Sequence, residues 1–136
     1  MNKYRENQGE KGLTENQLRE ILWEILEGKN LKKVLIIPPD FTRQHSNAGF
    51  ITNVLYHTLR SRGCQVDILL AQGTHEDISR EQFLMMYGDI PYEIMIPHRW
   101  REDTVSIGTV PSSYVKEVTE SLWSDELTVE VNKRVL

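Results

Sequence analysis

The sequence predicts an α/β fold: a three-layer, Rossmann-like domain with a mostly parallel central sheet. Two observations predict it. Short apolar, β-branched runs alternate with stretches whose apolar residues repeat at helical spacing, and each apolar run ends in a polar segment. The length of 136 residues is near that of one domain. We expect the polar, aperiodic residues 1–12 to be a flexible lead and residues 13–136 to form the domain.

The first helix is expected over residues 15–27. Thr14 and Gln17 have the spacing of a capping box, and apolar residues then recur three and four positions apart until Gly28. Residues 33–38 follow as a β-branched run that ends at two prolines, which is typical of a buried strand.

A second helix is expected over residues 47–62, where Ser46 can serve as the N-cap and Gly63 can end the helix. Residues 65–71 then form a second buried strand. Two strands joined through one helix make a βαβ unit, so they are parallel and their carboxyl ends share one edge of the sheet. The loops after the two strands should therefore face each other.

The pattern weakens towards the C-terminus. Ser79 and Gln82 repeat the capping-box spacing and predict a short helix up to Gly88, and residues 92–97 are typical of a third strand. Beyond Arg99, the β-branched segments 103–111 and 126–136 predict strands. Residues 112–123, which lie between them, are compatible with a short helix or with a strand and turn.

The composition limits the possible partners. There are 16 Lys and Arg residues against 20 Asp and Glu residues, so no basic field for nucleic acid is expected. No stretch approaches the roughly 20 apolar residues that cross a bilayer, and the N-terminus has no signal-peptide core. Cys64 is the only cysteine, which excludes an internal disulfide and a cysteine-rich zinc site. We expect a cytoplasmic protein without nucleic-acid or membrane partners.

Two polar loops carry the residues best suited to chemistry. They are Asp40, Thr42 and Arg43 after the first strand, and Thr74 and His75 after the second. Ligands of open parallel sheets bind outside the carboxyl ends of the strands, so these loops form the expected site. A guanidinium suits a carboxylate or phosphate, and Asp40 is placed to hold that of Arg43. An imidazole suits proton transfer near neutral pH.

Three further residues are candidates for the same site, namely His45, Glu76 and His98. Other interpretations of the site are weaker. The histidines lack the spacing of a zinc site, so no metal ligand is assigned within the chain. Neither a G-x-G-x-x-G motif nor a P-loop follows the first strand, which disfavours an ordinary NAD or ATP site. The structural alternative is that Asp40 and Arg43 pair to stabilise a turn and His75 is a polar residue before a helix.

Four segments resemble the N-terminal domain of the nickel-pincer-nucleotide lactate racemases. VLIIPPDFTR (34–43) resembles the family's strand and D-x-T-R motif, and DILLAQGTHE (67–76) resembles its strand and G-T-H motif. IGTVPS (107–112) and VEVNKRV (129–135) resemble later segments. The combination, in this order, makes the resemblance specific.

The resemblance implies an isomerase, namely a racemase or epimerase that acts at the α-carbon of a 2-hydroxy acid such as lactate. In that family a histidine takes the hydroxyl proton while the α-hydrogen moves as hydride to the nickel-pincer nucleotide. By motif match, His75 is one of two catalytic acid–base histidines, and Asp40 and Arg43 orient the substrate carboxylate or the cofactor. Thr42 and Thr74 add hydroxyl donors beside them.

The family's tether lysine, nickel-binding histidine and second catalytic histidine lie downstream of the segment at 129–135, and no lysine here matches the tether. We therefore expect this chain to be one domain of a longer enzyme, to need a C-terminal domain as partner and to be inactive by itself. The alternative is a non-catalytic domain that binds a small anion, a hydroxy acid or another protein. A small carboxylate, phosphate or sulfate should bind weakly near Arg43 and His75.

Overall fold

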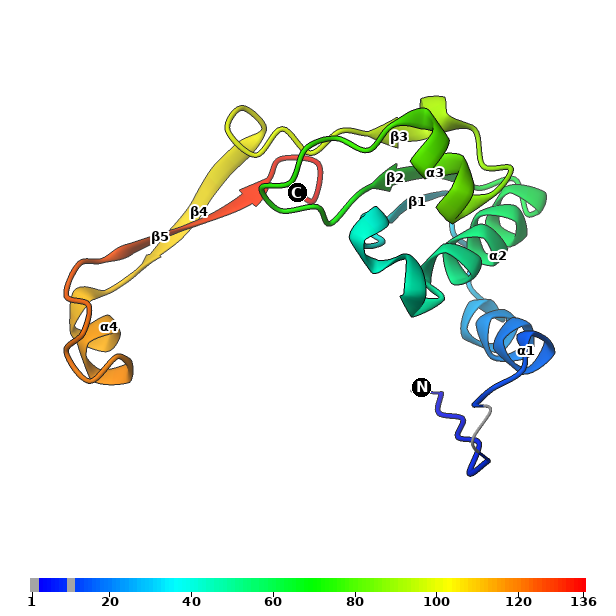
Figure 1. The fold of residues 1–136 in the computed structure, drawn as a ribbon, viewed down its shortest axis with the longest axis horizontal. Helices are drawn as coiled ribbons and strands as arrows, with labels where there is room; N and C mark the ends of the chain where they lie inside the picture. The colour runs from blue at the N-terminus through cyan, green and yellow to red at the C-terminus, as the bar shows by residue number, and fades with distance from the viewer. Residues whose placement is uncertain (1–2, 10–11) are drawn as a thin grey trace. The chain divides into compact units, whose positions relative to one another are not determined.

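The computed structural model describes residues 3–9 and 12–136. They fall into two compact units, the first up to Pro97 and the second from His98. The first contains a three-stranded sheet with helices and the second a two-stranded sheet (Figure 1). The predicted α/β, Rossmann-like class is confirmed, although the sheet is small. Within the described residues, no helix has the length and apolar character needed to cross a bilayer.

The parallel sheet has the order β1-β2-β3, with β2 in the middle (Figure 1). Its strands are β1 (Lys33–Ile36), β2 (Gln65–Leu69) and β3 (Met95–Ile96). Helix α2 (Ala48–Ser61) connects β1 to β2, and these strands pair in parallel, which confirms the predicted βαβ unit. Both strands are shorter than expected, yet a bridge between Pro39 and Ala71 continues their pairing up to the two loops.

Helices α1 (Glu15–Leu26) and α3 (Arg80–Tyr87) begin at the predicted capping boxes, on Thr14 and Ser79. The start of α2 differs from the prediction. A 3₁₀ helix, η1 (Phe41–Ser46), occupies the loop after β1, so Ser46 belongs to that helix and Asn47 is the N-cap. Asn47 has a left-handed backbone conformation, with a φ of 60°, and it links the two helices. Its side chain makes no capping bond to α2.

The third strand is also shorter than expected. Half of residues 92–97 form a second 3₁₀ helix, η2 (Tyr92–Ile94), and only β3 pairs with β2. Tyr92 packs edge-on against Phe83 with ring centroids 5.4 Å apart, and its hydroxyl donates to the carbonyl of Ile78. These tertiary contacts outweigh the local strand preference of the segment.

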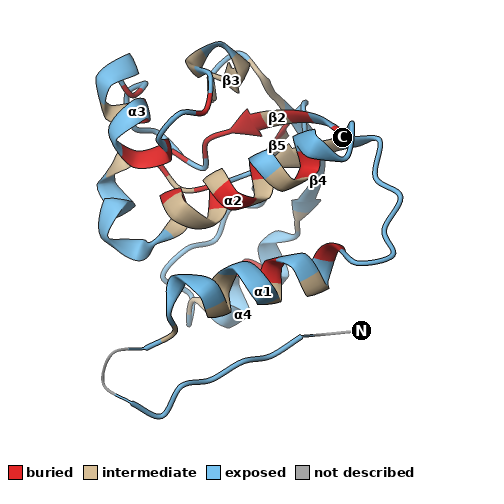
Figure 2. Cartoon of the chain, turned by 90° about the vertical axis from the view of Figure 1, so that its right-hand side faces the viewer, coloured by how far each residue is buried: buried red, intermediate tan, exposed pale blue. Residues whose placement is uncertain are grey.

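The core of the first unit is built by side chains from β2, α2 and α3 (Figure 2). Ile68, Phe83, Tyr87 and Ile90 are fully buried, and so is the only cysteine, Cys64. Helix α2 approaches α3 closely at Gly49, where an added Cβ would lie 1.9 Å from the carbonyl oxygen of Met86. Only glycine permits this approach without a shift of the backbone.

The second unit is a hairpin with little core. Strands β4 (Thr104–Val110) and β5 (Leu127–Asn132) pair antiparallel, and the segment between them forms the helix α4 (Ser112–Val118). From His98 onward only Val115 and Asn132 are buried. The register places apolar residues on one face of the hairpin and polar residues on the other. The apolar face consists of Val105, Val110, Leu127, Val129 and Val131.

Candidate active site

The two polar loops meet at the carboxyl edge of the sheet, as predicted. Asp40 follows β1 and His75 follows β2, and Asp40 Oδ2 lies 2.5 Å from His75 Nδ1. The bridge between Pro39 and Ala71 stands directly before the loops and brings them together. A cavity of about 250 Å³ opens here. Its lining residues are Asp40, Phe41, Thr42, His75, Glu76, Asp77, Ile78 and Gln82.

Asp40 is a buried carboxylate whose two oxygens are both bonded. Oδ1 accepts from the amide of Thr42 at 3.0 Å and from its hydroxyl at 2.5 Å, and Oδ2 accepts from His75. Burial by itself raises the pKa of the Asp40 carboxyl, but the bonds from Thr42 and His75 outweigh it and hold that pKa below its ordinary value. Asp40 is therefore ionised at neutral pH.

His75 is presented to the cavity by a turn that begins at Gly73. Gly73 has a φ of 59°, and the His75 amide donates to the Gln72 carbonyl at 3.0 Å, which closes the turn. Because the Asp40 carboxylate can only accept, Nδ1 of His75 carries the hydrogen and Nε2 of the neutral ring is an acceptor. The His75 side chain is 55% exposed, so Nε2 can reach a ligand. Asp40 and His75 form a hydrogen-bonded carboxylate–imidazole dyad.

Tyr87 of α3 supports the dyad from the core. Its hydroxyl donates to the carbonyl of Pro39, the residue before Asp40. Burial, together with the negative charge of Asp40, raises the pKa of the Tyr87 hydroxyl, so it stays protonated as a donor. Tyr87 was not predicted as a site residue, because a tyrosine within an apolar helical pattern is ordinarily a core residue.

Arg43 lies beside the dyad, but Asp40 does not hold it. Its Nη1 donates to the Thr42 hydroxyl at 3.2 Å, and it forms no ion pair with any described residue. The expected contact between Asp40 and Arg43 is absent, and the Asp40 carboxylate accepts from Thr42 and His75 instead. Thr74 and His45 are exposed and lie outside the cavity lining, whereas Glu76 is part of that lining.

His98 belongs to the second unit, where Asn132 fixes it. Asn132 Nδ2 lies 2.8 Å from His98 Nδ1, and Asn132 Oδ1 accepts from the amide of Arg134 at 2.9 Å. The amide nitrogen can only donate, so Nδ1 is an acceptor and Nε2 of the neutral ring carries the hydrogen. This tautomer is the opposite of that in His75.

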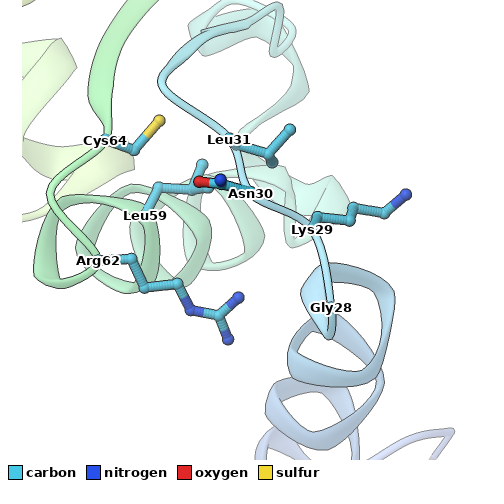
Figure 3. Close-up of a pocket in the computed structure, with 7 residues that line it drawn as sticks. All are labelled: Gly28, Lys29, Asn30, Leu31, Leu59, Arg62 and Cys64. Atoms are coloured by element: carbon cyan, nitrogen blue, oxygen red, sulfur yellow. The ribbon is translucent and has the colours of Figure 1, made fainter.

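A second cavity of about 250 Å³ lies beside the C-terminal end of α1. Figure 3 shows its lining residues, Gly28, Lys29, Asn30, Leu31, Leu59, Arg62 and Cys64. Its two cationic side chains, Lys29 and Arg62, come from separate segments (Figure 3). Arg62 donates to the carbonyl of Leu26 at 2.8 Å. None of these lining residues pairs an acid with a base, so the dyad cavity is the candidate active site.

The comparison with known families decides what this site belongs to. The lactate racemase N-terminal domain family matches residues 5–133. The chain belongs to this family. The motifs that carried the resemblance lie at the dyad, because Asp40 comes from D-F-T-R and His75 from G-T-H.

A solved structure is similar to this lactate racemase N-terminal domain. It is a crystal structure of a protein from Thermotoga maritima determined by the Northeast Structural Genomics Consortium, with 29% sequence identity and a TM-score of 0.82. The match covers 97% of this chain and 32% of that chain, so this chain spans about a third of its relative's length. No curated protein matched the sequence.

Proposed function

We propose that this lactate racemase N-terminal domain supplies acid–base catalysis to a 2-hydroxy-acid racemase or epimerase. The observation that carries the proposal is the 2.5 Å contact between Asp40 and His75 beside the cavity. Nε2 of His75 takes the proton of the substrate hydroxyl and later returns it. Asp40 holds the ring in the required tautomer and stabilises the positive charge that the ring acquires.

Arg43 is proposed to bind the substrate carboxylate or a cofactor phosphate. A guanidinium can form two parallel hydrogen bonds with such a group, and Arg43 has no competing ion pair among the described residues. Glu76 and Asp77 line another part of the cavity and repel an anion. The carboxylate is therefore expected on the Arg43 side.

The Arg43 guanidinium fits the organic part of a nickel-pincer nucleotide, because it can bind a phosphate or carboxylate. When bound, that cofactor would supply the acceptor for the α-hydrogen. The described residues contain no group of three or more His, Cys, Asp or Glu side chains that could hold a metal. We therefore assign nickel binding, the lysine tether and a second acid–base histidine to a C-terminal domain of a longer enzyme.

The test is racemisation of lactate by a complete enzyme that carries this domain and its cofactor, followed by chiral chromatography. His75→Ala is expected to lower kcat by about 10²- to 10⁴-fold because it removes the acid–base group. His57→Ala is the matched control, since His57 is paired with Asp89 away from the dyad cavity. Activity that survives His75→Ala would refute the proposal.

Anion binding can be measured on residues 1–136 by NMR titration with lactate and with phosphate. Shifts confined to residues 40–46 and 73–78, and abolished by Arg43→Ala, are the expected result. The same binding combined with no racemisation by the complete enzyme would favour the non-catalytic alternative. Shifts scattered over the surface, or unchanged by the substitution, would contradict the role of Arg43.

A further inference from the structure

Gln72 is a buried polar residue between β2 and the turn that carries His75. Its side chain donates from Nε2 to the carbonyl of His75 at 3.2 Å and to the carboxylate of Asp77 at 2.9 Å. Its Oε1 has no hydrogen-bond partner. Within the described part of the chain, it is the only buried side-chain nitrogen or oxygen in that condition.

The orientation of the Gln72 amide follows from its two partners. Both are acceptors, so turning the amide over would direct Oε1 at two other oxygen atoms. Nε2 must therefore face the turn, and Oε1 stays without a donor. A buried acceptor without a partner costs folding free energy. The fold carries this cost at a position 3% exposed, directly beside the dyad.

Gln72 holds both backbone groups of His75. Its carbonyl accepts from the His75 amide, and its side chain donates to the His75 carbonyl. The ring of His75 is held separately, by Asp40 of the other loop. The same Gln72 amide also binds Asp77, whose carboxylate follows His75 by two residues, and keeps it occupied.

We propose that Gln72 is a positioning residue for His75 and that it is retained at a cost in stability. It fixes the backbone at residue 75, so that the ring meets Asp40, and it restrains Asp77 from competing for the imidazole. The effect on racemisation rests on the function proposed above. The effect on the geometry of His75 does not, and it can be measured without substrate or cofactor.

A purely structural glutamine gives a different expectation. If the amide only stabilised the fold, its removal would lower the thermal midpoint and leave the His75 ring unchanged. If it positions His75, its removal should change the ring and spare the fold. The carbonyl and carboxylate it releases belong to exposed residues, which water can bond, and the unpaired Oε1 disappears.

The experiment uses residues 1–136 with Gln72→Met, which removes the amide but keeps the length of the side chain. Gln65→Met is the matched control, because Gln65 is exposed at the other end of β2. We expect the thermal midpoint of Gln72→Met to lie within about 2 °C of the wild type or above it. The ¹⁵N spectrum of the His75 ring should change from one tautomer with hydrogen on Nδ1 to a mixture of both. The control should change neither.

An unchanged His75 spectrum in Gln72→Met would overturn the positioning role. A midpoint lowered by more than about 5 °C, or failure to fold, would overturn the stability cost. Asp77→Ala would then test positioning alone, since it removes the competing carboxylate and leaves the bond from Gln72 to the His75 carbonyl. The single tautomer of His75 should persist in this variant, and a mixture of both tautomers would overturn the positioning role. The two proposals can fail separately. If Gln72→Met changes the His75 ring spectrum but the complete enzyme keeps its activity with His75→Ala, this inference stands and the proposed function is refuted.

Discussion

Both units contain strands with apolar side chains, but only the first unit buries them. In the first unit, helices α2 and α3 pack on the sheet, and Ile68 and Phe83 are fully buried. In the second unit, the apolar face of the hairpin is largely exposed, with Val129 at 39%. A sequence pattern can predict that a strand has an apolar face, but a two-stranded ribbon cannot cover that face by itself. The dyad lies in the unit whose core can fix a side chain.

The two units also hold their histidines in opposite ways. Asp40 accepts from Nδ1 of His75, whereas Asn132 donates to Nδ1 of His98. When a ring takes up a proton, both of its nitrogens become donors. Asp40 then gains a charge-assisted bond, but the Asn132 amide nitrogen meets another donor. The hydrogen bond of His75 to its partner is thus kept when the ring is charged, whereas that of His98 is not.

The largest expected difference between the units is in core substitutions. Phe83→Ala should lower the free energy of unfolding by about 3–5 kcal/mol, because it opens a cavity at a fully buried site. Val129→Ala on the exposed hairpin face should change it by about 0.5 kcal/mol or less. Urea denaturation of both variants measures the two values. A similar loss in both would mean that the hairpin face is covered in solution.

The next largest effect should come from Asp40→Asn, which gives His75 the kind of partner that His98 has. Both Asp40 oxygens accept, so an amide must direct its nitrogen either at Thr42 or at His75. With the nitrogen towards His75, the ring changes to the other tautomer. We expect the ¹⁵N spectrum of His75 to resemble that of His98, and kcat of the complete enzyme to fall by about 10²-fold or more. An unchanged tautomer would contradict this comparison.

The parts of the fold that depend on local sequence could be predicted, and those that depend on tertiary contacts could not. Capping boxes at Thr14 and Ser79 follow from residue spacing. Ser46 was wrongly expected to cap α2, because a 3₁₀ helix is a weak local preference that the Asp40 cap stabilises. The short β3 depends on where Tyr92 packs, which the sequence of that segment does not show.

At the site, motif and topology together predicted that Asp40 and His75 would be near each other. They could not predict which group Asp40 bonds, because that depends on the atoms that Thr42 already occupies. Gln72 did leave a signal. It is the polar residue that directly follows the apolar run of β2 and precedes Gly73, so a buried polar side chain beside the turn could have been suspected.

The smallest expected effect is the pH dependence of stability, and it too should differ between the units. The pKa of Asp40 is lowered in the folded chain, since bonds from Thr42 and His75 outweigh burial. The stabilisation of the folded chain by the Asp40 carboxylate is therefore complete above the pKa of the unfolded carboxyl, about 4. It is lost as the pH falls through the lower pKa of the folded chain. In the second unit, Lys133 likewise lowers the pKa of Asp103, through a 2.6 Å contact near the surface that solvent screens.

Urea midpoints measured from pH 7 to pH 2 should fall less steeply below about pH 4 for Asp40→Asn than for the wild type, whereas Asp103→Asn should follow the wild-type curve closely. If Asp103→Asn flattened the curve as much as Asp40→Asn, the exposed pair would stabilise the chain as strongly as the buried dyad. Burial would then not be what distinguishes the two units.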